Sequence, residues 1–232
     1  MLLPILTSTR IYRFPFAVVG LIATNAAIFF ITRNDALWYA QHWGYVPAES
    51  VGQTVGQLLQ PSVAKTLVTY AFLHGGWLHL IGNLWMLGVF GLALEAKVGR
   101  ARFTAMYFLF SVVAVLLHGF LGGHALIPCI GASGAISGVM GCYLAIEPRS
   151  RVLSLFFLGF VSFFTEIPCL FYASVWLVFQ IDAISTRLLT GPDCGNIAWW
   201  AHLGGFVAGL GVGLVMARPF KAPEPYAPEP EK

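Results

Sequence analysis

The sequence predicts an all-α membrane protein with six transmembrane helices. The chain has 232 residues, of which 58% are hydrophobic and 10% are charged, whereas a soluble domain carries about 25% charged residues. Its mean hydropathy is +0.77, so it has more apolar surface than a water-exposed fold can hide. A helix needs about 20 mostly apolar residues to cross a bilayer. Six segments approach this length: 15–32, 77–94, 103–121, 133–147, 167–186 and 198–217.

The first segment follows Arg10 and Arg13 and lacks a clear small-residue cleavage site. It is therefore expected to be a transmembrane helix and not a cleaved signal peptide. Residues 34–76, before the second segment, are expected to form a long outer loop with short helices at the membrane interface.

The fourth segment is short and follows a glycine-rich run. It is expected to begin below the membrane surface, where non-helical backbone must be buried in protein or line a wet cavity. Residues 152–165 are apolar and are expected to dip into the inner interface before the fifth segment. Residues 218–232 are rich in Pro and Glu and are expected to form a disordered cytoplasmic tail. Residues 1–217 are then the transmembrane domain.

The basic residues predict the orientation. Of the 13 Lys and Arg residues, ten share a side with the N-terminus and three lie on the other side. The ten are Arg10, Arg13, Lys97, Arg100, Arg102, Arg149, Arg151, Arg218, Lys221 and Lys232, and the three are Arg33, Lys65 and Arg187. The positive-inside rule places both termini in the cytoplasm. A short N-terminus without a transit peptide suggests a bacterial inner membrane.

The charge and the cysteine spacing indicate which classes of ligand the protein does not bind. The net charge is +3, with no basic run that would favour nucleic acid. The four cysteines form no metal-binding pattern, so no metal or cofactor is expected. Cys129 and Cys194 fall in loops on the predicted outer side and could pair in a disulfide.

Four polar residues are predicted to lie at one depth, because the second, fourth and sixth segments all begin on the outer side. They are His79, Asn83, Ser133 and His202. Polar side chains at such a depth usually face the bundle interior or a water-filled cavity.

Glycine spacing indicates how these residues meet. Gly205 and Gly209 follow His202 at i+3 and i+7, while Gly134 and Gly138 are four residues apart. Small residues at this spacing let two helices approach closely in lipid. Docking the two faces would place the fourth segment's serine beside His202.

This set of residues has the chemistry of a serine hydrolase. A serine hydroxyl is a weak nucleophile until a base takes its proton, and His202 could act on Ser133 first as base and then as acid. His79, Asn83 and the backbone N–H of Ser133 could stabilise an oxyanion. No Asp or Glu is expected near this depth, so a dyad is predicted.

Three stretches resemble the rhomboid family of intramembrane serine proteases. They are His74-Gly-Gly-Trp-Leu-His79-Leu-Ile-Gly-Asn83, Gly131-Ala-Ser133-Gly134 and Ala201-His202-Leu-Gly-Gly205. The resemblance covers roughly residues 14–217. It implies a six-helix rhomboid-like bundle with a serine nucleophile, a histidine base and an oxyanion-stabilising His and Asn.

The resemblance also bears on other positions. Glu95, followed by Lys97 and Gly99, matches a pattern whose role is structural, at the inner end of the second helix. Ser137 stands where some relatives carry a Tyr that packs on the catalytic His. Lys65 and Thr66 stand about where some relatives carry Trp-Arg.

The predicted function is cleavage of single-span membrane proteins in or near their transmembrane segments, within membrane lipid. Small residues at the cut site are implied by the resemblance alone. His74 is expected at the cavity mouth, with either a substrate-binding or a structural role. The sequence does not predict an oligomeric state.

Two other functions stay open. One is a catalytically silent relative that binds membrane proteins, which the intact Ser133 and His202 disfavour. The other is a small-solute transporter with Ser133, His79 and His202 along its pathway. The absence of paired broken helices disfavours a transporter.

Overall fold

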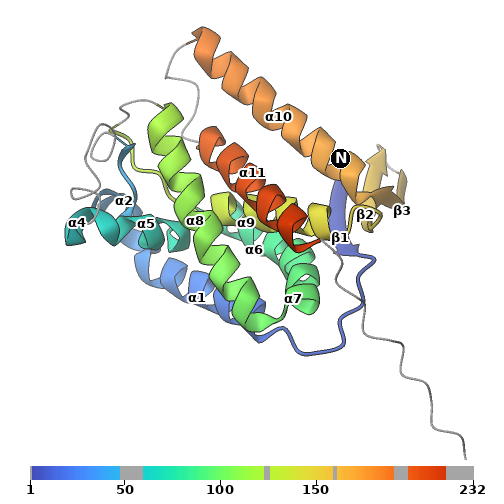
Figure 1. The fold of residues 1–232 in the computed structure, drawn as a ribbon. Helices are drawn as coiled ribbons and strands as arrows, with labels where there is room; N and C mark the ends of the chain where they lie inside the picture. Colours follow the sequence, from blue (N-terminus) through green and yellow to red (C-terminus); the bar gives the residue numbers. More distant parts are fainter. Residues whose placement is uncertain (1, 48–59, 123–125, 159–160, 191–197, 218–232) are drawn as a thin grey trace, which may run out of the picture.

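A helical bundle with a small β-sheet at one end makes up the fold (Figure 1). The computed structural model describes residues 2–47, 60–122, 126–158, 161–190 and 198–217. The predicted tail, 218–232, lies outside the described residues.

Four helices of the described chain are long and apolar enough to cross a membrane. They are Phe16–Trp43, Trp77–Val98, Arg100–Leu121 and Trp199–Met216. The first combines α1 (Phe16–Thr32), a 3₁₀ turn (Arg33–Asp35) and α2 (Ala36–Trp43). The second combines α6 (Trp77–Met86), a π-helical turn (Leu87–Gly91) and α7 (Leu92–Val98). The third and fourth are α8 (Arg100–Gly122) and α11 (Trp199–Met216).

Two shorter apolar helices complete the set. They are α9 (Ser133–Ile146) and the first part of α10 (Cys169–Thr190). Every predicted segment thus contains a helix, but only four meet the length and composition of a membrane span. That all six cross the bilayer stays a prediction.

The predicted loop 34–76 contains short helical pieces. In addition to α2 these are α4 (Pro61–Ala64), α5 (Thr66–Thr69) and a 3₁₀ turn (Tyr70–Phe72). Residues 48–59 lie outside the described residues, and the position of the loop at a membrane interface stays a prediction.

The expectation of an all-α fold is corrected at one end of the molecule. Within the predicted dipping segment 152–165, the described residues 152–158 and 161–165 belong to a three-stranded antiparallel sheet in the order β1-β2-β3. The strands are β1 (Leu2–Thr7), β2 (Arg151–Leu158) and β3 (Val161–Pro168). The runs Leu155–Phe157 and Ser162–Phe164 are rich in aromatic residues, which favour strands. The fifth helix accordingly begins at Cys169, after β3.

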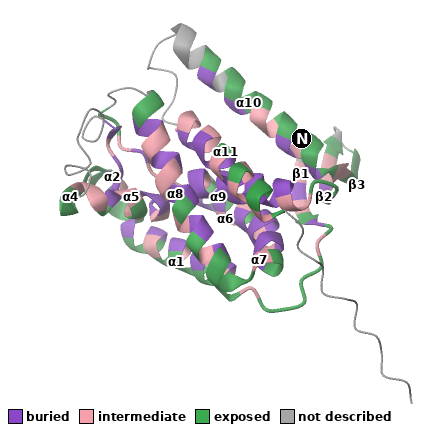
Figure 2. Cartoon of the chain, viewed as in Figure 1, coloured by how far each residue is buried: buried purple, intermediate pink, exposed green. Residues whose placement is uncertain are grey.

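The central helix of the bundle is α9, which is almost completely buried (Figure 2). It packs closely on α11 because both helices carry glycine where they cross. A Cβ at Gly205 would overlap the carbonyl oxygen of Gly134, and one at Gly209 would overlap that of Gly138. The glycine spacing therefore sets how closely the two backbones approach.

Glu95, at the far end of the α6–α7 helix, holds the start of α1. Its side chain is buried. Its Oε1 accepts the backbone N–H of Ala17 at 3.1 Å, and its Oε2 accepts that of Val18 at 2.8 Å. A carboxylate is favourable at a helix N-terminus, where the N–H groups have no partner within the helix. These contacts give Glu95 a structural role.

Candidate active site

Ser133 and His202 lie in direct contact. Ser133 is the first residue of α9, and His202 lies in the first turn of α11. The Oγ of Ser133 is 2.7 Å from Nε2 of His202, which is hydrogen-bonding distance for a serine and its base. The close packing of Gly205 on Gly134 lies directly after Ser133 in α9 and about one turn after His202 in α11. The two helix starts are therefore held side by side.

A third residue, Gln180 of α10, completes a chain of hydrogen bonds. Its Oε1 lies 2.7 Å from Nδ1 of His202, and its side chain is buried, with Nε2 donating to the carbonyl of Trp176 at 3.3 Å. Since the amide oxygen can only accept, Nδ1 carries the proton. Nε2 is then free to accept the proton of Ser133.

Sequence reasoning missed Gln180. It is a polar residue within the largely apolar first part of α10, Cys169–Asp182. That is the signal that could have drawn attention to it, since polar residues within apolar spans usually face the protein interior. What the sequence did not give was the rotation of α10 that directs this residue toward His202.

Aromatic rings surround the histidine. The ring centroid of Trp176 lies 6.2 Å from that of His202, and that of Trp199 lies 5.8 Å from it in an edge-to-face arrangement. Ser137 faces back to the serine, because its Oγ donates to the carbonyl oxygen of Ser133 at 2.7 Å. Tryptophans from α10 and α11 therefore pack around His202.

Asn83 has a buried amide group with a free donor. Among the described residues, its Nδ2 donates to no acceptor. Asn83 lines a cavity together with Ser133 and His202, so this N–H donor is available to an acceptor that enters there. The first N–H groups of α9, beside Ser133, also have no partner within their helix.

His79 lies one turn before Asn83 and faces the loop that precedes Ser133. The backbone N–H of Gly75 approaches its Nδ1 at 3.5 Å, and its Nε2 is directed at Gly131. Gly131 has a φ of +117°, a conformation that only glycine adopts readily. A side chain there would also collide with the imidazole of His79.

A small cavity connects these groups. It has a volume of about 70 Å³, which is room for a few water molecules and is well below the 300 Å³ or more of typical ligand pockets. Its lining residues are Asn83, Met86, Ser133, Ile136, Ser137, Met140, Trp176 and His202. The structure thus brings three of the four predicted site residues to one cavity. His79 does not line this cavity but lies one turn before Asn83, against Gly131.

His74 is buried and does not lie at an open cavity mouth. Its ring centroid is 5.0 Å from that of His79. Burial, with a further contribution from His79, lowers the pKa of His74 from 6.5 to about 4. A neutral imidazole packed behind His79 fits the structural one of its two expected roles.

Other predicted features are only partly visible. Cys129 is buried, while Cys194 lies outside the described residues. Within the described ranges, no group of three His, Cys, Asp or Glu side chains is arranged to hold a metal ion.

Comparison with known proteins assigns the family. The rhomboid domain matches residues 61–219, which include all four predicted site residues. Rhomboid protein 1, mitochondrial, of Saccharomyces cerevisiae is 23% identical over 206 residues, which cover 87% of this chain and 53% of that protein. RHOMBOID-like protein 5 of Arabidopsis thaliana is 26% identical over 166 residues, which cover 72% of this chain and 48% of that protein.

A bacterial relative is also similar. Putative rhomboid protease YdcA of Bacillus subtilis is 37% identical over 82 residues, which cover 34% of this chain and 39% of that protein. This chain spans about half the length of the yeast and plant relatives. Because the domain match covers more than half of the chain and the helices are long and apolar, this is an integral membrane protein that belongs to the rhomboid family.

Proposed function

We propose that this protein is an intramembrane serine endopeptidase. The observation that carries the proposal is the 2.7 Å contact between Ser133 Oγ and His202 Nε2, beside a small cavity among apolar helices. Family membership supports it, because two relatives are named as proteases, YdcA of Bacillus subtilis and Rhomboid-like protease 3 of Toxoplasma gondii.

In the proposed reaction, Nε2 of His202 takes the proton of Ser133 as Oγ attacks the peptide carbonyl carbon. The carbonyl oxygen becomes an oxyanion, which Asn83 Nδ2, His79 and the Ser133 backbone N–H stabilise. His202 then protonates the leaving amine, and the C–N bond breaks to give an acyl-enzyme. A water molecule activated by His202 releases the second product.

Gln180 acts as a positioning residue in this scheme. Its Oε1 accepts a hydrogen bond from the Nδ1–H of His202, which fixes the imidazole tautomer that leaves Nε2 unprotonated before attack. It is neutral, so it orients His202 without the charge that a carboxylate would add.

The proposed substrates are single-span membrane proteins, cleaved in or near the transmembrane segment. An extended peptide must reach Ser133, and the cavity of about 70 Å³ has room only for water. Substrate entry therefore requires helices around the cavity to move apart. We further propose that the chain crosses the membrane six times with both termini in the cytoplasm, as the ten-to-three distribution of basic residues favours.

The test is covalent labelling together with cleavage. A fluorophosphonate probe should label the purified protein as Ser133 Oγ forms a bond to phosphorus and fluoride leaves. Labelling and cleavage of a tagged single-span substrate in liposomes should both be lost in Ser133→Ala and in His202→Ala. Ser162→Ala on β3 and His42→Ala on α2 serve as controls at exposed positions.

The outcomes separate the candidate functions. Labelling that persists in Ser133→Ala would refute the assignment of the nucleophile. A wild-type protein that neither cleaves nor reacts would exclude the peptidase and favour a binding or transport role.

A further inference from the structure

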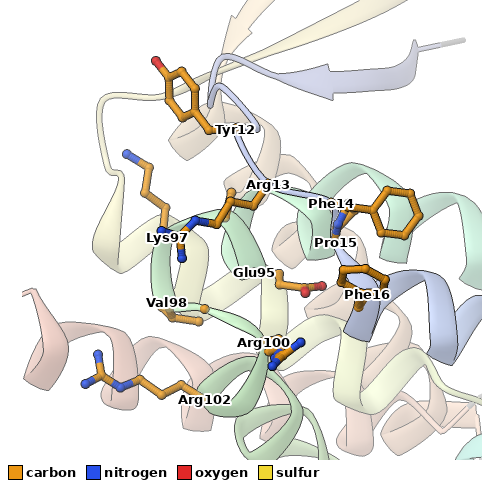
Figure 3. A pocket seen from close by; sticks show the side chains of 12 residues that line it. Tyr12, Arg13, Phe14, Pro15, Phe16, Glu95, Lys97, Val98, Arg100 and Arg102 are labelled. Carbon is orange, nitrogen blue, oxygen red and sulfur yellow. The ribbon is translucent and has the colours of Figure 1, made fainter. Parts of the chain in front are cut away.

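A second cavity lies at the opposite end of the α6–α7 helix from the candidate active site. Its volume is about 730 Å³, and it is formed by the segment before α1, the end of α7 and the start of α8 (Figure 3). Glu95 in its wall is 16 residues beyond His79, which corresponds to roughly 24 Å along a helix axis. The two sites therefore lie near opposite ends of this candidate membrane span.

Positive charge dominates this cavity. Four basic residues line it, Arg13, Lys97, Arg100 and Arg102, against the single acidic residue Glu95. They come from three separate segments and surround Glu95 (Figure 3).

Two of these positive charges are not neutralised. The carboxylate of Glu95 already accepts two backbone N–H groups of α1, and Lys97 pairs with Glu147 at 2.5 Å. Arg13 and Arg100 have no carboxylate within ion-pair distance among the described residues. A guanidinium group binds phosphate and carboxylate oxygens well, because its N–H donors match their geometry.

Aromatic side chains lie beside these basic residues. Tyr12, Phe14 and Phe16 line the cavity and are exposed by 83%, 62% and 63%. The rings of Phe14 and Phe16 pack edge to face, with centroids 4.7 Å apart. Three candidate membrane spans begin or end at this cavity, so the rings lie at the depth where aromatic residues contact lipid headgroups and upper acyl chains.

We propose that this cavity binds the phosphate group of an anionic glycerophospholipid. Arg13 and Arg100 hold the phosphate, while Phe14 and Phe16 contact the glycerol and the first acyl carbons. Basic pockets between membrane spans are suited to such headgroups. A soluble phosphate ester offers the same anion but cannot use the exposed rings, so the lipid is the favoured ligand. The bound lipid would join the start of α1 to α7 and α8.

The test is lipid binding to the full chain in non-ionic detergent, followed by native mass spectrometry. The probes are phosphatidylglycerol, phosphatidylcholine and glycerol 3-phosphate. The wild type should bind phosphatidylglycerol in preference to the other two. Arg13→Gln and Arg100→Gln should each weaken this binding about fivefold, which corresponds to roughly 1 kcal/mol per basic residue near a membrane surface.

Arg149→Gln is the matched control. Arg149 is an exposed basic residue that does not line the cavity, so its removal should leave binding unchanged. The unfolding temperature of each variant without added lipid checks that it is folded.

Three results would overturn the proposal. They are equal binding of phosphatidylcholine and phosphatidylglycerol, binding of glycerol 3-phosphate as strong as that of the lipid, and an equal loss of affinity in Arg149→Gln. The first two use only the wild type, so they decide the question even if an arginine variant does not fold.

Discussion

Gln180 offers a test of how His202 is held. In Gln180→Leu the imidazole loses the acceptor for its Nδ1 proton, and a hydrogen bond to a group that becomes charged contributes about 1.5–3 kcal/mol. We expect kcat for a single-span substrate to fall roughly 10- to 100-fold, with little change in KM. Gln180→Glu keeps an acceptor and should retain more activity than the leucine variant.

Phe179→Leu is the neighbouring control, because Phe179 is 65% exposed. Its kcat should match the wild type. An equal loss of kcat in Phe179→Leu and Gln180→Leu would mean that any substitution in this part of α10 lowers activity. Gln180 would then have no specific role in positioning His202.

Replacement of Asn83 should lower the activity without lowering the stability. Its Nδ2 donates to no protein acceptor among the described residues, so the folded protein gains no hydrogen bond between its own groups from this donor. Asn83→Ala should lower kcat about 10²- to 10³-fold, as the loss of one oxyanion donor does. The unfolding temperature should be unchanged or higher. A parallel fall in kcat and unfolding temperature would show that Asn83 is structural.

Two glycines of α11 should respond differently to the addition of a side chain. Gly209 lies in the contact with α9, whereas Gly211 does not. A Cβ at Gly209 would overlap the carbonyl of Gly138, whereas one at Gly211 would meet nothing within 4 Å. Gly209→Ala should cost about 1–3 kcal/mol through overpacking. Gly211→Ala should be neutral or stabilising by up to about 1 kcal/mol, because alanine favours a helix more than glycine does.

Unfolding temperature and fluorophosphonate labelling measure this pair. Gly209→Ala should lower both, since separating the helices also separates Ser133 from His202. If Gly209→Ala and Gly211→Ala give the same unfolding temperature and the same labelling, the packing of α9 on α11 does not require a glycine at position 209.

The same glycine contact explains why much of the site could be predicted from the sequence. Helix packing in lipid depends on small residues at regular spacing, and both the spacing and the apolar runs can be read directly along the chain. They led to the pair Ser133 and His202 and to the approximate place of all six helices.

The sheet and Gln180 could not be predicted in the same way. The pairing of Leu2 with Phe156 joins residues that are 154 positions apart (156 − 2), and no local pattern marks such a partner. Apolar runs within the strands, such as Leu155–Phe157, also break the alternation of apolar and polar residues that marks a half-buried strand, so the segment resembles one that dips into the membrane. The alignment of Gln180 depends on the rotation of α10 against α11, which spacing within one helix does not fix.

Across the whole molecule, the buried α9 lies between the candidate active site and the basic cavity. The candidate dyad is at the start of this helix, and the basic cavity lies at the far end of the α6–α7 helix. The exposed side chains of α10, including Leu170, Phe171 and Val178, show that this helix packs on the bundle along one face only (Figure 2). It contributes Gln180 and Trp176 to the site from the periphery of the fold, so a displacement of α10 would alter the support of His202.

The stability of the folded chain should decrease in acid because of His74. Its pKa is about 4 in the folded protein and 6.5 in an exposed histidine, so the unfolded chain takes up the proton first as the pH falls. The stabilisation that comes from keeping His74 neutral is complete above pH 6.5, is lost progressively between pH 6.5 and 4, and does not change further below pH 4. At about 1.4 kcal/mol per pKa unit, this amounts to roughly 3 kcal/mol.

Chemical denaturation in detergent at pH 7.5 and pH 4.5 measures this difference. Carboxylates also titrate in acid, so the informative quantity is the change in the pH dependence between the wild type and His74→Gln. The variant should lose less stability between the two pH values, even if it is less stable at pH 7.5 because it no longer packs on His79. An identical pH dependence in the two proteins would mean that His74 is charged to the same extent in the folded and unfolded chains, contrary to its burial.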